Sequence, residues 1–247
     1  MKIIEYGKQN SSIIMLLHGG GLSWWNYRAE AELLSDRCHV VLPVLDGHAD
    51  SGRSFTSIEE NADRIISFID SEYGGSVLLI GGLSLGAQIL VEMLSRRKDI
   101  CRYAIIESAS VIPSGMTNAL IGPTFAASYG LIRRKWFARM QFRYLHIRED
   151  LFENYYQDTS KVSRDSMIAF LKANTAYETK PEFQNNCAQT RIIVGGKEQR
   201  KMIRSSWLLY GMLPGSQLEI KGGLYHGEYS LNHPEEYVND LLEMIGK

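Results

Sequence analysis

Residues 77–90 read VLLIGGLSLGAQIL, and this stretch determines the fold class that the sequence predicts. It begins with a continuous apolar run, which is typical of a strand buried on both faces of a parallel sheet, and it ends in a helical pattern. Between the two lies Gly82-Leu83-Ser84-Leu85-Gly86, a Gly-x-Ser-x-Gly pentapeptide in a strand–turn–helix context. Such a turn places the serine hydroxyl at the N-terminus of the next helix, where developing negative charge is favoured. Ser84 is therefore the candidate nucleophile.

Further apolar runs alternate with amphipathic stretches on both sides of this segment. Additional strands are expected at residues 13–17, 40–45, 103–106, 191–194 and 217–220. Helices are expected at residues 25–34, 57–69 and 85–94, and from Pro234 to the C-terminus. Ser57 and Glu60 have the spacing of a capping box. The alternation predicts an α/β fold with a mostly parallel, doubly wound sheet covered by helices.

The region from residue 111 to residue 186 interrupts the alternation. It contains no convincing buried strand and is rich in aromatic and basic residues. We expect a mostly helical insertion over the carboxyl ends of the strands, where ligands bind in open α/β sheets. The predicted division is a core of residues 1–110 and 187–247 and a helical cap of residues 111–186.

Bulk composition limits the classes of protein that remain. The 247 residues fit one large α/β domain with an insertion, and 45% hydrophobic residues are enough for a core without disulfides or metal. A formal net charge of −1 does not favour a nucleic-acid partner. No segment approaches the roughly 20 apolar residues of a membrane span, and the N-terminus lacks a signal peptide pattern. Cys38, Cys101 and Cys187 are widely separated, which favours a reduced, cytoplasmic protein.

With these motifs in place, the chain from about Ile13 to the C-terminus resembles the α/β-hydrolase family, in particular its small capped esterase- and lipase-like members. The sequence His18-Gly19-Gly20-Gly21 follows the first buried strand. The resemblance implies that the backbone N–H groups of Leu85 and Gly20 form an oxyanion hole, with Gly21 as the donor if the loop differs by one residue.

Residues 45–54, LDGHADSGRS, look like the family's Gly-His-Gly-x-Ser loop, with Ala49 where glycine is usual. Asp46, His48 and Asp50 have no spacing that indicates a metal site, so we interpret this segment as a structural loop with internal hydrogen bonds.

The base and the acid are expected in two later loops. Residues 222–227, GGLYHG, carry His226 in the position where the family has its general base. His233 is the rival, but it directly precedes Pro234 and suits the start of a helix. The family usually places an aspartate after the strand that follows the cap, whereas this chain has Glu198 there and no aspartate between Asp165 and Asp240. The resemblance gives the acid role to Glu198, with Glu107 at the end of an earlier strand as the alternative.

Two patterns in the insertion bear on the substrate. Trp136, Met140, Tyr144 and Ile147 fall on one helical stripe, which either packs the insertion on the core or forms the wall of an apolar acyl pocket. Lys135, Arg139 and Arg143 recur every four residues. They are interpreted as a solvated helix face, and the alternative is a site for an acidic substrate group or an anionic partner.

Together these features predict a serine hydrolase that cleaves a carboxylic ester or related acyl bond of a small molecule through an acyl-enzyme on Ser84. The reaction needs no metal and no organic cofactor. Cleavage of an amide, thioester or C–C bond, acyl transfer, and a slow-turnover ligand receptor remain alternatives. The sequence leaves the oligomeric state open, and a homodimer is among the options.

Overall fold

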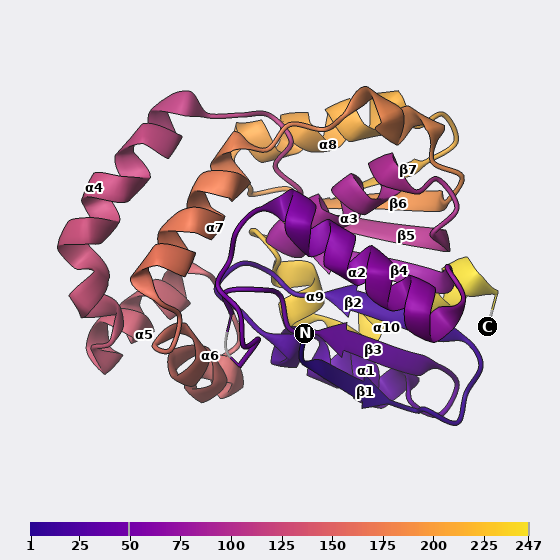
Figure 1. Cartoon of the computed structure of the whole chain (residues 1–247), viewed down its shortest axis with the longest axis horizontal. Helices are drawn as coiled ribbons and strands as arrows, with labels where there is room; N and C mark the ends of the chain where they lie inside the picture. The colour runs from indigo at the N-terminus through magenta and orange to yellow at the C-terminus, as the bar shows by residue number, and fades with distance from the viewer. Residues whose placement is uncertain (49, 247) are drawn as a thin grey trace.

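The computed structural model describes residues 1–48 and 50–246, apart from the side chains of residues 126–128, and Ala49 in the predicted 45–54 loop lies outside the described residues. The described chain contains a seven-stranded sheet with strand order β1-β3-β2-β4-β5-β6-β7 (Figure 1). The strands are β1 (Ile3–Tyr6), β2 (Ile13–Leu17), β3 (His39–Pro43), β4 (Val77–Leu83), β5 (Cys101–Glu107), β6 (Gln189–Gly195) and β7 (Gln217–Lys221). All neighbours are parallel except β1, which pairs antiparallel with β3. The predicted fold class is confirmed, and β1 is an edge strand that the apolar runs did not predict.

The strand order places two important loops side by side. The chain leaves β2 for β3 on one side, whereas β4, the other neighbour of β2, continues to β5 on the opposite side. This is the topological switch point, where the carboxyl ends of adjacent strands open a crevice. Leu17 at the end of β2 is in register with Gly82 near the end of β4. The loop that begins at His18 and the turn at Ser84 therefore lie at the same edge of the sheet.

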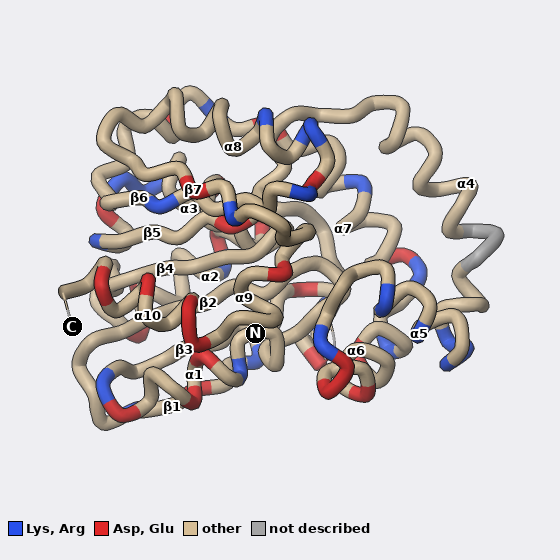
Figure 2. Tube along the Cα trace, turned by 180° about the vertical axis from the view of Figure 1, so that it is seen from behind, with Lys and Arg blue, Asp and Glu red and all other residues tan. Residues whose placement is uncertain are grey.

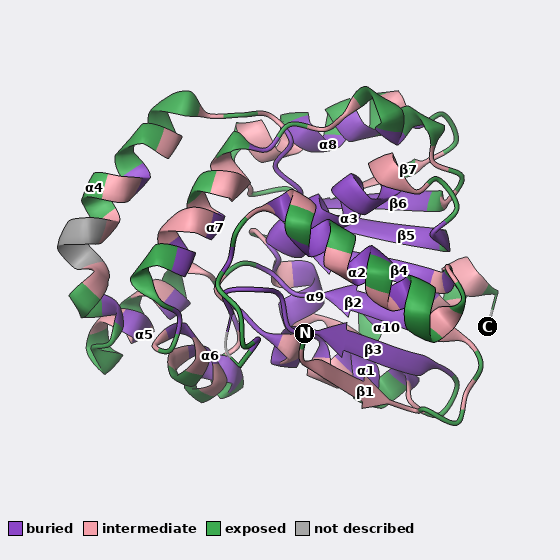
Figure 3. Ribbon diagram, in the orientation of Figure 1, coloured by how far each residue is buried: buried purple, intermediate pink, exposed green. Residues whose placement is uncertain are grey.

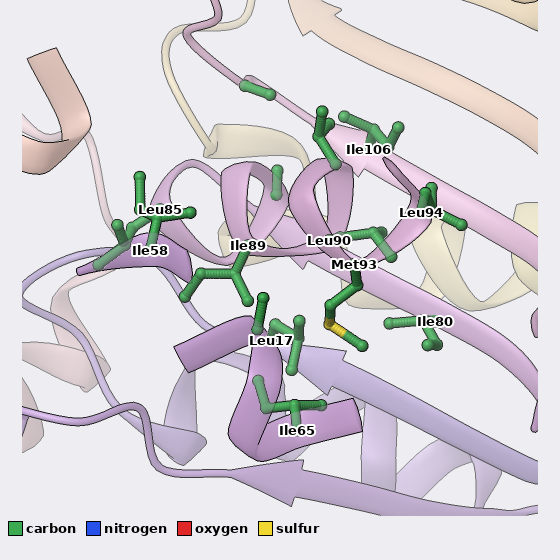
Figure 4. Packing of buried hydrophobic residues seen from close by; sticks show 14 of the residues in the cluster. Leu17, Ile58, Ile65, Ile80, Leu85, Ile89, Leu90, Met93, Leu94 and Ile106 are labelled. Carbon is green, nitrogen blue, oxygen red and sulfur yellow. The ribbon is translucent and has the colours of Figure 1, made fainter. Parts of the chain in front are cut away.

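Helices cover both faces of the sheet and bury two apolar cores. The helices of the main layers are α1 (Arg28–Leu34), α2 (Ile58–Tyr73), α3 (Leu85–Arg96), α8 (Arg200–Met212), α9 (Glu228–Asn232) and α10 (Pro234–Ile245). Side chains of α2 and α3 meet those of the central strands in one core, as Leu17, Ile65 and Ile89 do in Figure 4. The other core lies beneath α1 and α10 and includes Trp25 and Tyr237. The sheet is thus covered on both faces, which explains the uninterrupted apolar runs of its central strands.

The start of α2 shows half of the predicted capping box. The hydroxyl of Ser57 accepts a hydrogen bond from the Glu60 amide at 3.0 Å. The Glu60 carboxylate, however, accepts from the Thr56 hydroxyl at 2.7 Å and pairs with Arg64. Only the serine half of the reciprocal motif is therefore in place.

The segment between β5 and β6 is helical and lies beyond the carboxyl ends of the strands (Figure 1). Its elements are α4 (Gly115–Ile132), α5 (Lys135–Tyr144), η2 (Glu149–Leu151), α6 (Phe152–Thr159), α7 (Arg164–Ala176) and η3 (Pro181–Asn185). The buried side chain of Phe170 on α7 belongs to the first core, and Phe142 on α5 belongs to the second. Within the described residues, no helix is both long and apolar enough to cross a membrane. The exact domain limits at residues 111 and 186 stay a prediction.

The apolar stripe expected to attach the insertion points to solvent instead. Trp136 is 64% exposed, Met140 55% and Tyr144 80%, whereas Ala138 and Phe142 are the buried residues of α5. Exposed residues occur along the helices of the insertion in Figure 3. The packing interpretation of the stripe is wrong for these three residues, and Ile147, which is buried, lies beyond the end of the helix.

Two of the three basic residues in the predicted repeat of α5 interact with acidic residues of the following segment. Lys135 pairs with Glu153 at 2.7 Å, and Arg139 pairs with Glu149. Basic and acidic segments accordingly lie beside each other at α5 and α6 in Figure 2. This face is therefore solvated and tied to its neighbour by exposed ion pairs, each of which contributes little to stability.

Candidate active site

Ser84 occupies a strained turn between β4 and α3. Its φ of 53° lies in the left-handed region, which a residue with a side chain seldom adopts. A Cβ atom at Gly82 would lie 2.6 Å from the carbonyl oxygen of Gly86, and one at Gly86 would overlap the carbonyl oxygen of Leu17. Strand and helix therefore approach closely only because both positions are glycine. The Ser84 amide donates to the carbonyl of Glu107 at 2.9 Å, which fixes the turn to β5.

His226 reaches Ser84 from the loop between β7 and α9. Its Nε2 lies 3.0 Å from the Oγ of Ser84, and its Nδ1 lies 2.6 Å from Oε2 of Glu198. Because a carboxylate only accepts, Nδ1 carries the proton and Nε2 is free to accept from the serine hydroxyl. The loop turns at Gly227, with φ 68°, where a Cβ atom would lie 2.9 Å from the side chain of Leu83.

Glu198 lies in the turn after β6, and its side chain is only 1% exposed. Its Oε1 accepts from the hydroxyl of Ser108 at 2.6 Å and from the amide of Gly195 at 2.9 Å, while Oε2 faces His226. Burial raises the pKa of this carboxyl, but the hydrogen bonds and the nearby imidazole outweigh it and leave the pKa below its usual value. Glu198 is therefore a charged acceptor in the resting site.

The imidazole of His226 is more basic than usual. Burial lowers its pKa, but the hydrogen bond to Glu198 and the charges of Glu198 and Glu107 raise it, so the net pKa lies above the ordinary 6.5. An imidazolium formed at Nε2 would therefore be stabilised by the two carboxyl groups.

Glu107 lies near this site without joining it. It ends β5, is buried, and its Oε1 accepts from the amide of Ser230 at 3.2 Å. Burial raises the pKa of its carboxyl to about 7, with a further rise from the charge of Glu198. The structure brings Glu198, and not Glu107, into hydrogen-bonding contact with His226.

The two residues expected to donate to an oxyanion approach each other. A Cβ atom at Gly20 would lie 3.5 Å from Cβ of Leu85 and 3.3 Å from the ring of Phe170. Leu85 is the first residue of α3, so its amide has no carbonyl within the helix to which it could donate. The neighbouring Gly19 amide already donates to Asn26 at 3.1 Å. This geometry is compatible with donors at Leu85 and Gly20, whose role stays a prediction.

The five other histidines lie outside the hydrogen-bonded group, and three of them were part of the motifs or alternatives considered above. His18 Nε2 accepts from the Leu45 amide at 3.1 Å, and His48 Nδ1 lies 3.0 Å from the carbonyl of Asp46. Burial lowers the pKa of His18 to about 3 and that of His48 to about 4, so both are neutral supports of the neighbouring loops. His233 stands at the start of α10 and lies 3.3 Å from Glu236.

The loop at residues 45–54 is held by internal hydrogen bonds. The Gly47 amide donates to the carbonyl of Arg53 at 2.8 Å, and the Ser51 hydroxyl donates to the same carbonyl at 3.0 Å. Asp46 turns away to Arg64, 2.9 Å distant. In the part of the chain that the structure describes, no group of three or more His, Cys, Asp or Glu side chains could hold a metal ion.

The sequence did not predict Ser108 or the surroundings of His226. Ser108 follows the end of β5 in the left-handed region, with φ 56°, and no motif marks it as a partner of Glu198. A cavity of about 520 Å³ lies beside His226 and Glu198, between the insertion and the turn after β6. Its walls combine residues from distant parts of the chain, such as Thr117, Tyr144 and Lys201, which no local pattern brings together.

Comparison with known proteins agrees with this architecture. A model of the alpha/beta hydrolase family matches residues 14–239. An enol-lactonase from Burkholderia xenovorans LB400 has a TM-score of 0.83 at 14% identity, over 100% of this chain and 96% of that one. An esterase from Exiguobacterium antarcticum has a TM-score of 0.82 at 16% identity, over 99% and 95%. A thermophilic esterase from Thermogutta terrifontis has a TM-score of 0.79 at 17% identity, over 98% and 91%. At these identities the likeness concerns the fold.

A comparison with curated proteins gives no match. The family model covers most of the chain, and the chain therefore belongs to the alpha/beta hydrolase family, a family of hydrolases.

Proposed function

We propose that the protein is a serine hydrolase that cleaves a carboxylic ester of a small molecule, with Ser84, His226 and Glu198 as its catalytic triad. The observation that carries the proposal is the continuous hydrogen-bonded chain from the Ser84 hydroxyl through the imidazole to a buried carboxylate, at 3.0 and 2.6 Å. This order of nucleophile, base and acid is the arrangement that activates a serine for acyl transfer.

The reaction follows from the positions of these groups. His226 takes the Ser84 proton at Nε2 as Oγ attacks the carbonyl carbon, and Glu198 stabilises the resulting imidazolium through Nδ1. The amides of Leu85 and Gly20 hold the negative charge of the tetrahedral intermediate. The imidazolium then protonates the leaving alcohol. A water molecule, deprotonated by the same nitrogen, releases the acid from Ser84.

An ester is the bond class that we favour within the family. Two of the similar folds described above belong to esterases and one to an enol-lactonase, which supports an open or cyclic ester as substrate. The amide, thioester and C–C alternatives use the same first steps and differ in the leaving group that His226 must protonate.

The test is labelling with a fluorophosphonate followed by intact-mass measurement, on the wild type, Ser84→Ala and His226→Ala. We expect one rapid adduct on the wild type, none on Ser84→Ala, and labelling slowed at least about 100-fold for His226→Ala. A panel of short and medium acyl esters, assayed on the same three proteins, should give turnover that disappears with the label. A folded wild type that takes no label and cleaves no ester would contradict the proposal.

A further inference from the structure

The cavity beside His226 has a charge distribution that the proposed reaction does not use. It is bounded by the insertion, through Thr117 and Tyr144, and by the turn after β6 and the start of α8, through Lys197 and Lys201. The imidazole of His226 forms part of the same wall. A ligand in this cavity therefore contacts the imidazole whose Nε2 lies 3.0 Å from the Oγ of Ser84.

The two lysines of the cavity have no acidic partner. Among the described residues, neither ammonium group lies within 4.0 Å of a carboxylate. Glu198 is the acidic residue of the cavity wall, and its two oxygens are taken by Ser108, Gly195 and His226. Two ammonium groups therefore share the cavity with one carboxylate, and the charge of that carboxylate is directed at His226.

Both lysines line the cavity that His226 also lines, and Lys197 contacts the residue before His226. The Nζ of Lys197 lies 5.0 Å from the ring centroid of Tyr225, the residue that precedes His226. The same ring stacks on His146 of the insertion, with centroids 3.8 Å apart. Lys201 lies in the first turn of α8, and burial lowers the pKa of its ammonium, as expected for a cation that has lost water without gaining a counter-charge. In Figure 2, Lys and Arg residues gather where α8 faces α7.

The rest of the cavity wall suits a ligand with an apolar body. Tyr144, Leu145 and Met202 contribute apolar surface, and the methylene stems of the lysines add to it. Several hydroxyls interrupt this surface, among them Ser114 and Thr117, which are hydrogen-bonded to each other at 2.9 Å. A small molecule with one charged end matches such a wall better than an extended neutral acyl chain.

We infer that Lys197 and Lys201 form an anion-binding subsite, and that the preferred substrate is an ester that carries a second, anionic group, such as a carboxylate. The inference rests on the proposed function, because it places this group relative to the ester that Ser84 attacks. His226 returns its proton to the leaving oxygen, and the imidazole lines the cavity, so the anionic group belongs to the leaving-group half of the substrate.

Matched ester pairs test the subsite. The first pair is para-carboxyphenyl butyrate and its neutral isostere para-carbamoylphenyl butyrate, with the charge on the leaving group. The second is para-nitrophenyl hydrogen glutarate and para-nitrophenyl glutaramate, with the charge on the acyl half. We expect the wild type to prefer the anionic member of the first pair by about tenfold or more in kcat/KM, since charge-assisted hydrogen bonds are the stronger ones. Salt should reduce this preference.

The lysine variants then locate the effect. Replacing both lysines (Lys197→Met with Lys201→Met) should bring the anionic-to-neutral ratio of kcat/KM close to one, and Lys201→Arg should retain most of it. Lys98→Met removes the same charge from an exposed residue that precedes β5, at the opposite edge of the sheet, and should leave the ratio unchanged.

Binding gives a readout that does not depend on turnover. Calorimetric titration of Ser84→Ala with para-carboxyphenyl butyrate should show an affinity that falls about tenfold or more when both lysines are replaced. The subsite would be overturned if the wild type and the double variant had the same anionic-to-neutral ratio of kcat/KM, or the same affinity for para-carboxyphenyl butyrate. A preference for the anionic ester that appears only in the glutarate pair would overturn the placement of the anionic group on the leaving group. A wild type that cleaves none of these esters would instead contradict the proposed function. The calorimetric comparison would still show whether the two lysines bind the anionic group.

Discussion

The backbone carbonyl of Glu107 accepts the amide hydrogen of Ser84 at 2.9 Å, while the carboxyl of the same residue accepts from the amide of Ser230, which lies beyond His226 in the chain. One residue at the end of β5 thus contacts both the turn at Ser84 and the segment that follows the loop of His226. It does so from a buried position, and burial raises the pKa of its carboxyl to about 7. Glu107 is therefore a structural support of the site that carries a titratable group.

We expect Glu107→Gln to change how stability depends on pH. In the folded state the carboxyl holds its proton up to about pH 7, against an ordinary pKa of 4.5. Between these values the folded chain binds the proton and the unfolded chain has lost it, so the free energy of unfolding falls as the pH rises. Over this pH range the shifted carboxyl lowers the free energy of unfolding by at most about 3 kcal/mol. Glutamine is neutral throughout, so the variant should gain stability relative to the wild type between about pH 4.5 and 7.

Denaturant unfolding across this pH range, followed by circular dichroism, measures the effect. The exposed Glu178→Gln serves as the control and should keep a constant difference from the wild type. A Glu107→Gln curve that runs parallel to the wild type at every pH would mean that the carboxyl ionises normally.

Glu198→Gln should separate the electrostatic role of this carboxylate from its role in orientation. The amide cannot supply the charge that raises the pKa of His226, so the acid limb of the profile of kcat/KM against pH should move to lower pH. In the wild type the midpoint of that limb should lie above 6.5, because the base must be neutral. The value of kcat should fall by about 100- to 10,000-fold, since the amide no longer fixes the tautomer.

A pH–rate series on para-nitrophenyl butyrate with the wild type, Glu198→Gln and Glu107→Gln checks this prediction. Glu107→Gln should shift the limb in the same direction by a smaller amount, because the Glu107 carboxyl raises the pKa of His226 only where it is ionised, near and above about pH 7. If the acid limb of the Glu198→Gln profile has the same midpoint as that of the wild type, a group other than Glu198 sets the pKa of His226.

Gly82→Ala should disrupt the turn that holds Ser84, the proposed nucleophile. The new methyl carbon would lie 2.6 Å from the carbonyl oxygen of Gly86, a backbone atom that cannot move without displacing α3. We expect a loss of about 2–4 kcal/mol in the free energy of unfolding, or no folded protein, together with loss of fluorophosphonate labelling. Gly211→Ala, where nothing lies within 4 Å of the added atom, should be neutral or slightly stabilising.

Two aromatic residues of α5 provide a matched test of how the insertion is attached. Phe142 is fully buried and Trp136 is 64% exposed. Phe142→Ala should destabilise the protein by about 3–5 kcal/mol, whereas Trp136→Ala should change the free energy of unfolding by less than about 0.5 kcal/mol. Thermal unfolding of the two variants measures this difference. If Trp136 were instead the buried residue, Trp136→Ala would cause the larger loss of stability.

The error over the α5 stripe has a simple physical origin. Trp136, Met140 and Tyr144 form the larger apolar pattern, and hydrophobicity alone favours them for burial. The face that is buried carries only Ala138 and Phe142, a weaker periodic signal. Periodicity identifies a helix and its two faces, but the partner that covers a face comes from elsewhere in the chain.

Two missed elements show the same limit. The strand β1 spans Ile3–Tyr6, is half-buried, and pairs on one side only, so it lacks the continuous apolar run of the central strands. The helix α8 buries Ser205, Ser206 and Leu209 while exposing Trp207 and Leu208. Its inner face is thus marked by serines, one of which accepts a hydrogen bond from the Val111 amide. A pattern of apolar residues does not reveal such a face.

The parts of the candidate site that the sequence indicated are those with a local reason. Ser84 stands between glycines that the crossing of strand and helix requires, and His226 and Glu198 follow strands that end at the same edge of the sheet. Ser108 was not indicated, because its contact with Glu198 spans 90 residues and depends on the pairing of β5 with β6. The cavity beside His226, with Lys197 and Lys201 in its wall, also depends on where the insertion lies, which is a property of the folded chain.

The position of β7 has a consequence for how the enzyme fails under stress. β7 is the last strand of the sheet, pairs with β6 alone and is only partly buried, yet the loop that follows it carries His226. Margins of sheets open at lower free energy than their centres. Brief opening at this margin would switch the protein off reversibly while its helices and central strands stay intact. Warming should therefore abolish ester cleavage several degrees before the far-ultraviolet dichroism changes, and cooling should restore it. The temperature range over which the site stays assembled should then be set by an edge strand of the sheet and not by its centre.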